Sequence, residues 1–233
     1  MLFRSKAAKK TTDYPAAQAA FRAASGQSGT RIAYMGEEAM SECEKHEFEN
    51  TLALHTAPTL LGVKCANLVS VSQSERTVRS YVESCAESAA AHGVRMKILC
   101  RCRERTLVYV YHEKLLSAWL SRADVGNFLS DHGYTADMSF EEKLSLLTAR
   151  MSCGSFPHEI GAFLGYPIED IRGFIENQGR NCLLCGCWKV YGNVEAARRT
   201  FNIYGRCRDI LCDRLNKGLD MFQALKISKE ELS

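Results

Sequence analysis

Two adjacent segments with β-strand patterning constrain the fold of this chain more than any other feature. Apolar and polar residues alternate over 94–102, and residues 107–112 are rich in Val and Tyr. The short polar stretch 103–105 between them is typical of a β-hairpin turn. Because helical patterns surround this pair, the sequence predicts an α+β domain. We expect a small mixed or antiparallel sheet of about four strands covered by helices.

The segments around the hairpin alternate between helical and strand patterns. We expect an amphipathic helix that ends near His55, with Pro58 marking its exit, followed by a strand over 67–72. The C-terminal half is predicted to be rich in helix, with a last strand at 184–191 before a long final helix. Residues with the chemistry of helix N-caps precede three of the expected helices: Ser74, Ser139 and Asn193.

Charge and composition divide the chain into a body and two tails. The first 30 residues carry five Lys or Arg and one Asp, whereas the net charge of the whole chain is +3. We therefore expect residues 1–30 to form a disordered basic tail, 31–216 a single α+β domain and 217–233 a solvated C-terminal tail. The body is close to neutral, which argues against a nucleic-acid partner, because such a partner needs a clustered basic face.

The cysteine content indicates the compartment. Eleven cysteines are present, an odd number, and several lie at positions with core-like spacing. No apolar run reaches the ~18 residues that a membrane span needs, and the first 30 residues contain no run typical of a secretory signal. The sequence thus predicts a protein of the reducing cytoplasm with no membrane association.

Residues 156–167 form the most distinctive stretch, with the sequence FPHEIGAFLGYP. It predicts two short helices joined at a glycine turn, a pattern that superficially resembles a helix-turn-helix. The second helix carries three acidic residues against one arginine, so it is unsuited to reading DNA. His158 and Glu159 are candidates for acid–base catalysis or metal binding, although capping or packing explains His158 equally well. Ala162 stands where a zinc-protease motif would need its second histidine.

A second candidate region follows the first expected helix. His55, Thr59 and Lys64 are expected in a loop between this helix and the next strand, where open sheets place ligand groups. Lys64 lies between Val63 and Cys65 and is expected to be partly buried, so it either pairs with a buried acid or binds a carboxylate or phosphate. Cys65 would be a nucleophile only beside a base such as His55; an inert buried thiol is the simpler interpretation.

The third candidate region combines thiols and aromatic residues near residue 185. Cys182 and Cys185 have the spacing of a zinc knuckle, with Cys187 two residues further, but no second pair with standard spacing is present. In the strand that follows, alternation places Trp188 and Lys189 on opposite faces. One of the two should face the core, and the other should be free for a ligand or solvent.

Several of these motifs occur together in one known family. In this order, APTLLGVKCANLVS, RTLVYVYHEKLL, FPHEIGAFLGYPIEDIRGFIENQG and WKVYGN resemble a family of functionally uncharacterised proteins from clostridia and related anaerobic Firmicutes. The resemblance covers about residues 36–210. It implies a cytoplasmic protein of an anaerobe and assigns no activity. Cys65 and the cysteines at 182, 185 and 187 depart from the family's pattern, which weakens catalytic or metal roles for these thiols.

Three hypotheses for function follow. The leading one is a pocket formed by the 55–64 loop and the start of the helix at His158, which binds a small anionic metabolite or cofactor. In this hypothesis Lys64, Thr59 and other polar residues bind the ligand, and any chemistry uses a histidine or acidic residue. The binding set is completed by Arg105, Lys189 and Tyr191, and the catalytic set is His158, Glu159 and His55. The alternatives are a metal or haem protein that uses His/Glu ligands or the cysteine cluster, and an adaptor that binds a protein through residues 157–178.

Overall fold

The computed structural model describes residues 40–102, 105–152 and 156–227. The expected basic tail, residues 1–30, lies outside this range, as do the last six residues of the expected C-terminal tail. Within the described ranges, no helix combines the length and apolar character that crossing a membrane requires.

A three-stranded antiparallel sheet forms the centre of the fold. Strands β1 (Ala66–Val71), β2 (Val94–Cys102) and β3 (Arg105–His112) are arranged in the order β1-β3-β2. The predicted hairpin between β2 and β3 is confirmed. A register shift between Ile98 and Cys100 interrupts the regular alternation of β2. This irregularity lets Leu99 turn into the core, where it is buried.

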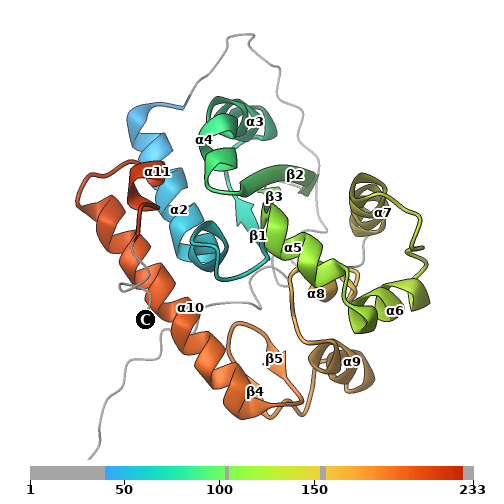
Figure 1. Cartoon of the computed structure of the whole chain (residues 1–233). Coiled ribbons are helices and arrows are strands. Elements are labelled where there is room, and N and C mark those ends of the chain that lie inside the picture. Colours follow the sequence, from blue (N-terminus) through green and yellow to red (C-terminus); the bar gives the residue numbers. More distant parts are fainter. Residues whose placement is uncertain (1–39, 103–104, 153–155, 228–233) are drawn as a thin grey trace, which may run out of the picture.

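Helices cover both faces of this sheet, so the domain has three layers (Figure 1). On one face, which we call the α2–α10 side, lie the helices α2 (Glu42–Leu60), α3 (Glu75–Ser84), α4 (Ala86–Ala91), α11 (Met221–Ala224) and the C-terminal half of α10 (Val194–Asn216). On the other face, the α8–α9 side, lie α5 (Glu113–Leu120), α6 (Ala123–Asp131), α7 (Phe140–Ser152), α8 (Ile160–Phe163) and α9 (Ile168–Glu176). The N-terminal half of α10 also packs there. The expected helix-rich α+β class is therefore confirmed.

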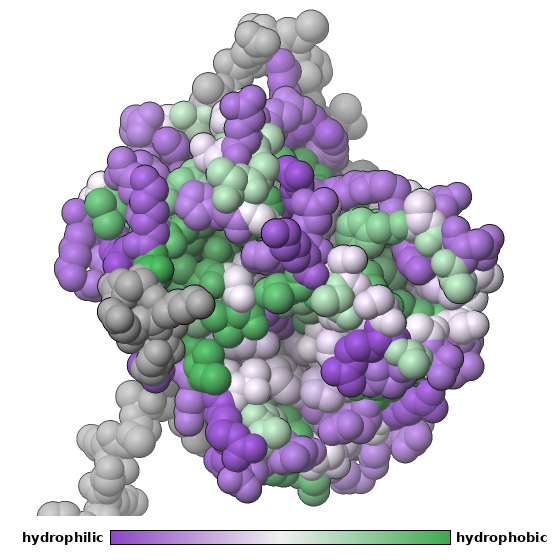
Figure 2. All heavy atoms as spheres, in the orientation of Figure 1, coloured by the Kyte–Doolittle hydropathy of each residue, from purple (hydrophilic) through white to green (hydrophobic). Residues whose placement is uncertain are grey.

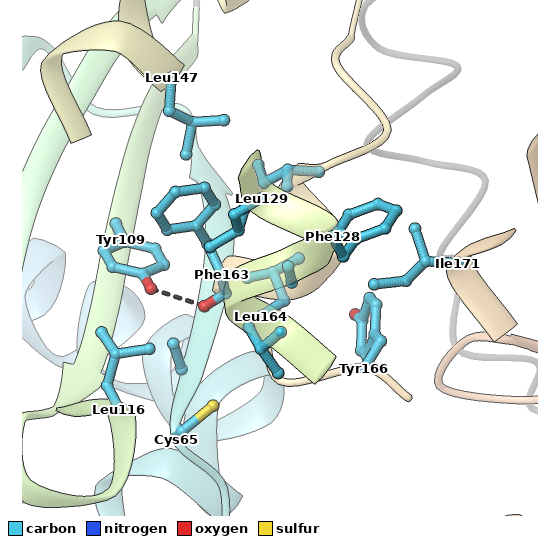
Figure 3. Packing of buried hydrophobic residues seen from close by; sticks show 14 of the residues in the cluster. Cys65, Tyr109, Leu116, Phe128, Leu129, Leu147, Phe163, Leu164, Tyr166 and Ile171 are labelled. Atoms are coloured by element: carbon cyan, nitrogen blue, oxygen red, sulfur yellow. Dashed lines mark hydrogen bonds between the residues drawn. The ribbon is translucent and has the colours of Figure 1, made fainter. Parts of the chain in front are cut away.

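The central strand β3 divides the core into two clusters. Val108 and Val110 point to the α2–α10 side, whereas Leu107 and Tyr109 point to the α8–α9 side. Figure 3 shows Tyr109 reaching α8, where its hydroxyl donates a hydrogen bond to the carbonyl oxygen of Phe163 at 2.6 Å. The alternation of one buried strand thus anchors α8, the helix that follows His158.

The predicted caps account for several helix starts. The side chains of Ser74 and Asn193 accept hydrogen bonds from the backbone of α3 and α10, and Ser139 and Glu142 form the predicted capping box at α7. Each cap satisfies amide groups that have no partner inside the helix.

Three expected elements differ from the structure. The first helix does not end near His55 but continues through Pro58 to Leu60. The chain instead turns after Leu60, where the carbonyl of Pro58 accepts hydrogen bonds from the amides of Val63 and Lys64. His55 and Thr59 therefore lie on a helix and not in a loop.

The expected last strand at 184–191 is a separate hairpin. Its halves, β4 (Leu184–Cys185) and β5 (Lys189–Val190), pair with each other and not with the central sheet. A turn joins the two strands, and β5 packs against α9.

Part of the expected solvated C-terminal tail is packed. Met221 and Ala224 of α11 are buried in the core of the α2–α10 side, and Asp220 caps this short helix.

Apolar residues on the face shown in Figure 2 gather over α2 and α10, while polar residues cover most of the periphery.

Candidate functional site

A pocket lies between the α8–α9 pair and the β4–β5 hairpin. Its volume is about 150 Å³, and it opens to solvent on one side. Most of its walls are aromatic or aliphatic, and the polar groups include one histidine and one lysine. The lining residues are Phe156, Pro157, His158, Ile160, Gly161, Tyr166, Asp170, Ile171, Phe174, Cys185, Gly186, Trp188 and Lys189.

A close packing of α8 on α9 shapes the floor of this pocket. Gly165 ends the first helix with a φ of +73°, a conformation that favours glycine. A Cβ added to Gly161 would lie 2.9 Å from the side chain of Ile171, so glycine is needed for the two helices to approach. The predicted helical pair with a turn at Gly165 is thus present, and it serves as one wall of a pocket.

His158 and Lys189 meet at the ring of Phe174. The His158 side chain is exposed and makes an edge contact with this ring, with 5.3 Å between ring centroids. The Lys189 Nζ lies 5.8 Å from the same ring and donates a hydrogen bond to the carbonyl of Gly179 at 2.5 Å. Two residues 31 positions apart in the sequence therefore place basic groups beside one apolar pocket. Of the predicted site residues, His158, Lys189 and Cys185 line it.

Trp188 and Lys189 differ in burial, as expected for neighbours of which one faces the core. Trp188 is buried and stacks on Tyr166, with ring centroids 5.3 Å apart, whereas Lys189 is half-buried. Both side chains line the pocket.

Asp170 is a site residue that the sequence did not reveal. Its buried carboxylate accepts hydrogen bonds from Trp188 Nε1 at 2.7 Å and from the backbone amides of Tyr191 and Gly192 at 2.7 and 2.9 Å. These contacts attach the β4–β5 hairpin to the first turn of α9. An acid in a first turn predicts only an interaction with the helix dipole, so the sequence carried no signal for this long-range anchor.

Glu159 points away from the pocket. Its carboxylate is buried and accepts hydrogen bonds from Arg150 at 2.6 Å and from the Tyr134 hydroxyl at 3.4 Å. Burial of a carboxylate without such partners would cost several kcal/mol. In this structure Glu159 joins α7 to the start of α8 and does not share the pocket with His158.

The structure places His55, Thr59 and Arg105 away from the pocket. Thr59 donates a hydrogen bond to Asn67 Oδ1 at 2.7 Å, and Arg105 donates to the carbonyl and hydroxyl oxygens of Ser70. His55 is exposed on α2; partial desolvation and then the charge of Arg105 lower its pKa. The expected group of His55, Lys64 and His158 therefore does not form, because α2 extends further than expected.

Lys64 is buried, as expected, but no residue that the structure describes is the acidic partner that a buried lysine usually has. Its side chain is 5% exposed, and its Nζ lies 4.9 Å from the centre of the Tyr166 ring and 5.9 Å from that of Tyr204. Over the described ranges, neither an ion pair nor a hydrogen bond to a side chain involves this Nζ. Burial lowers the pKa of Lys64 to about 8, and the nearby thiols of Cys65 and Cys187 offset this only in part.

The thiols beside Lys64 do not act as its counter-ions. Burial raises the pKa of Cys65 and of Cys187 above the usual range of a thiol, so both are neutral near pH 7. In the helical turn opposite, a Cβ added to Gly165 would lie 2.3 Å from the Cys65 Sγ. Cys65 thus fills a packing position, which agrees with its interpretation as an inert thiol.

The cysteines of the third candidate region do not come together as a metal site. Cys185 is exposed and lines the pocket, whereas Cys187 lies in the hairpin turn near Lys64. In the described ranges, no three His, Cys, Asp or Glu side chains are grouped so that they could hold one metal ion. The hairpin explains this, because its turn directs Cys185 and Cys187 to different neighbours.

Tyr191 contributes a buried hydroxyl near this hairpin. In the described part of the chain, its oxygen has no hydrogen-bond partner. The ring packs closely on Gly173 of α9, where an added Cβ would lie 2.5 Å from the Tyr191 Cβ. Tyr191 therefore supports the contact between hairpin and helix and does not line the pocket.

The fold and the pocket together define a helix-rich α+β protein with an aromatic-lined pocket between a helix pair and a hairpin. The family model described as "Protein of unknown function (DUF3793)" matches residues 52–225, and the chain belongs to this family. Every pocket-lining residue falls within the matched range. Neither the curated proteins nor the solved structures contain a match to this chain.

Proposed function

We propose that this protein binds a small molecule with a flat apolar body and an anionic group in the pocket between α8–α9 and the β4–β5 hairpin. The observation that carries the proposal is the convergence of His158 and Lys189 on an otherwise mainly apolar pocket. Small-molecule sites commonly combine apolar walls with a few polar groups that orient the ligand.

The charge distribution favours an anion. Asp170 is the acidic residue among the lining residues, and three hydrogen bonds from the hairpin already occupy its carboxylate. The Lys189 ammonium has three donors, and the Gly179 carbonyl uses one of them. Two donors therefore remain for a carboxylate or phosphate of the ligand, and His158 adds a further donor at the rim.

The size and walls of the pocket favour a ring. An engineered protein cavity of similar volume accepts benzene. Phe174 and Trp188 offer ring faces and edges against which a planar ligand can pack. The proposed ligand is thus one planar ring whose anionic substituent points to Lys189.

If chemistry takes place in this pocket, His158 is its general acid or base. It is exposed at the rim, and its contact with Phe174 orients the imidazole. Glu159 does not share this role, because Arg150 and Tyr134 hold its carboxylate elsewhere. The proposed setting is the cytoplasm of an anaerobic bacterium, where the free cysteines would stay reduced.

A pair of uncharged and charged probes tests this proposal. We would measure binding of benzoate and of benzyl alcohol, which has a similar size but no charge, by ligand-observed NMR. Benzoate should bind about tenfold more tightly, because one charge-assisted hydrogen bond is worth about 1.4 kcal/mol or more. Lys189→Met should remove this preference and leave the binding of benzyl alcohol unchanged.

Lys114→Met provides a matched control, because Lys114 is exposed on α5 and does not line the pocket. This variant should keep the wild-type preference for benzoate. Equal binding of the two probes to the wild type would contradict the proposal, as would an equal loss in both lysine variants. Native mass spectrometry of protein purified without oxygen would then show whether a natural ligand copurifies.

A further inference from the structure

We propose that Lys64 is a carbonyl-reactive amine that forms an imine with an aldehyde or ketone group of the pocket's ligand. This inference rests on the proposed function and specifies the ligand class further: an anionic ring compound that carries a carbonyl group. It assigns to Lys64 a covalent role in place of the electrostatic role expected from the sequence.

The surroundings of Lys64 carry the inference. The side chain is 5% exposed, and aromatic rings from two distant segments, Tyr166 and Tyr204, face its Nζ. The other groups that affect its charge are the thiols of Cys65 and Cys187. No carboxylate among the described residues forms an ion pair with this amine.

An amine in such a site has a specific chemical property. Glu159 and Asp170 are also buried on this side of the sheet, yet each has its own partners and none of these is Lys64. A buried lysine without an acidic partner loses its proton more readily than a lysine in water, and the neutral amine is the form that attacks carbonyl groups. The lowered pKa of about 8 agrees with this expectation.

The wall of the pocket connects Lys64 to the ligand. Tyr166 lines the pocket and stacks on Trp188, which also lines it. The Lys64 Nζ lies 4.9 Å from the centre of the same Tyr166 ring. Lys64 itself does not line the pocket, so the reaction requires Tyr166, the ring that contacts both the amine and the pocket, to move.

The reaction needs no further reactant. The nitrogen of neutral Lys64 forms a bond to the carbonyl carbon and gives a carbinolamine. The carbon–oxygen bond then breaks, the oxygen leaves as water with the two protons of the amine, and a carbon–nitrogen double bond remains. The step neither oxidises nor reduces either partner, and hydrolysis reverses it.

Reductive trapping tests the inference with 4-formylbenzoate, which combines a ring, a carboxylate and an aldehyde. The full-length protein would be treated with this probe and cyanoborohydride at pH 7.5, and each lysine's modification would be followed by peptide mass mapping. Lys64 should react about tenfold faster than the exposed Lys114 in the same sample, because a larger fraction of its amine is neutral. Its reaction rate should level off above about pH 8, whereas the rate of a lysine with the ordinary pKa of about 10.4 would continue to rise.

Substitutions of Tyr166 provide a second measurement. Tyr166→Ala should increase the rate at Lys64 several-fold, because it opens the wall, and Tyr166→Phe should leave the rate near that of the wild type. Circular dichroism would verify that both variants are folded. Lys64→Arg keeps a cation in the site but cannot form an imine, so it should abolish the trapped product at this position.

Two outcomes overturn the inference. One is modification of Lys64 no faster than that of Lys114 in both the wild type and Tyr166→Ala. The other is a rate at Lys64 that rises with pH in parallel with that at Lys114. Benzoate lacks the aldehyde, so its binding reports on the pocket alone: benzoate binding without trapping at Lys64 would reject the imine and retain the proposed function. Failure of benzoate to bind would reject the proposed function, and the inference with it.

Discussion

Buried charged residues have different kinds of partners on the two sides of the central sheet. On the α2–α10 side, the buried acid Glu49 accepts one hydrogen bond from Tyr81 at 3.0 Å, and the surrounding core is apolar. On the α8–α9 side, Glu159 and Asp170 are buried with several partners each, and Lys64 is buried with none that is acidic. The α2–α10 side thus resembles an ordinary core, whereas the α8–α9 side contains a buried amine whose removal from water costs free energy.

This difference identifies one buried residue, Lys64, that a contribution to stability does not explain. Glu159 and Asp170 can be understood as anchors, because each joins two separate elements of the fold. Among the described residues, the Lys64 amine forms no hydrogen bond to a side chain and no ion pair, and an apolar residue in its place would avoid the cost of burying an amine. The pocket of the proposed function and the amine of the proposed imine both lie on the α8–α9 side, where this amine is buried.

The largest expected effect is at Asp170. Asp170→Ala removes the acceptor of three hydrogen bonds and leaves Trp188 Nε1 and two backbone amides without partners. We expect the free energy of unfolding to fall by about 4 kcal/mol in urea denaturation. Asp131→Ala is the control, because Asp131 is exposed in an ion pair with Arg172 at 3.4 Å and should change stability by less than about 0.5 kcal/mol. Similar losses in both variants would show that Asp170 is no anchor.

Glu159 should follow, with a loss of stability but no loss of binding. Glu159→Ala leaves Arg150 and the Tyr134 hydroxyl without their acceptor, so the free energy of unfolding should fall by about 3 kcal/mol. The binding of benzoate to the folded fraction should stay within about twofold of the wild type. A large loss of affinity for benzoate at unchanged stability would instead show that Glu159 takes part in ligand binding.

Lys64 should make stability depend on pH in the alkaline range. Its pKa is about 8 in the folded protein, compared with about 10.4 in an unfolded chain. Between these values the unfolded state binds more protons, so stability rises as the pH increases. Relative to Lys64→Met, the wild type should gain up to about 3 kcal/mol between pH 8 and pH 10.4, measured by urea denaturation. Parallel curves for the two proteins would contradict the unpaired state of Lys64.

The smallest effect is expected at Glu49 on the opposite side of the sheet. Burial raises the pKa of Glu49 above its ordinary value, and the hydrogen bond from Tyr81 lowers it only in part. The stability that this group contributes is therefore present at low pH and is lost as the pH rises through its folded pKa. Glu49→Gln should gain stability relative to the wild type between pH 4 and pH 7. A relative gain in the reverse direction would show that Glu49 is stabilised as a carboxylate.

Local features of the fold were predictable from the sequence. The caps at Ser74, Ser139 and Asn193 use side-chain chemistry that acts within three residues, and the β2–β3 hairpin follows from alternation. The burial of Lys64 was also predictable, because apolar neighbours surround it in the sequence. These signals need no knowledge of distant segments.

The candidate site was predictable only in part, because distant segments complete it. His158 and Lys189 were candidates from the sequence and both line the pocket, but their partners at Phe174 and Gly179 lie beyond the range of any local pattern. The position of His55 in a loop was wrong because proline was taken as the end of a helix, although the helix continues for two residues beyond Pro58.

The partners of the buried charged residues were hidden for the same reason. Arg150 pairs with Glu159 from another helix, and Tyr204 reaches Lys64 from α10, 140 positions along the chain. The sequence left open whether Lys64 has an acidic partner. Only the packing of α10 across both clusters shows that rings, and not an acid, face its amine.

The protonation of Lys64 itself is the most direct test of this account. The ε-carbon resonance of lysine reports the charge of its own amine, and comparison with Lys64→Arg assigns the signal of Lys64 in protein labelled with ¹³C-lysine. We predict a titration midpoint of about 8 for Lys64, against about 10.4 for a lysine side chain in water. A midpoint for Lys64 at or above the value in water would show that an unrecognised anion holds the ammonium. It would contradict the central claim that no acidic partner among the described residues pairs with this buried amine.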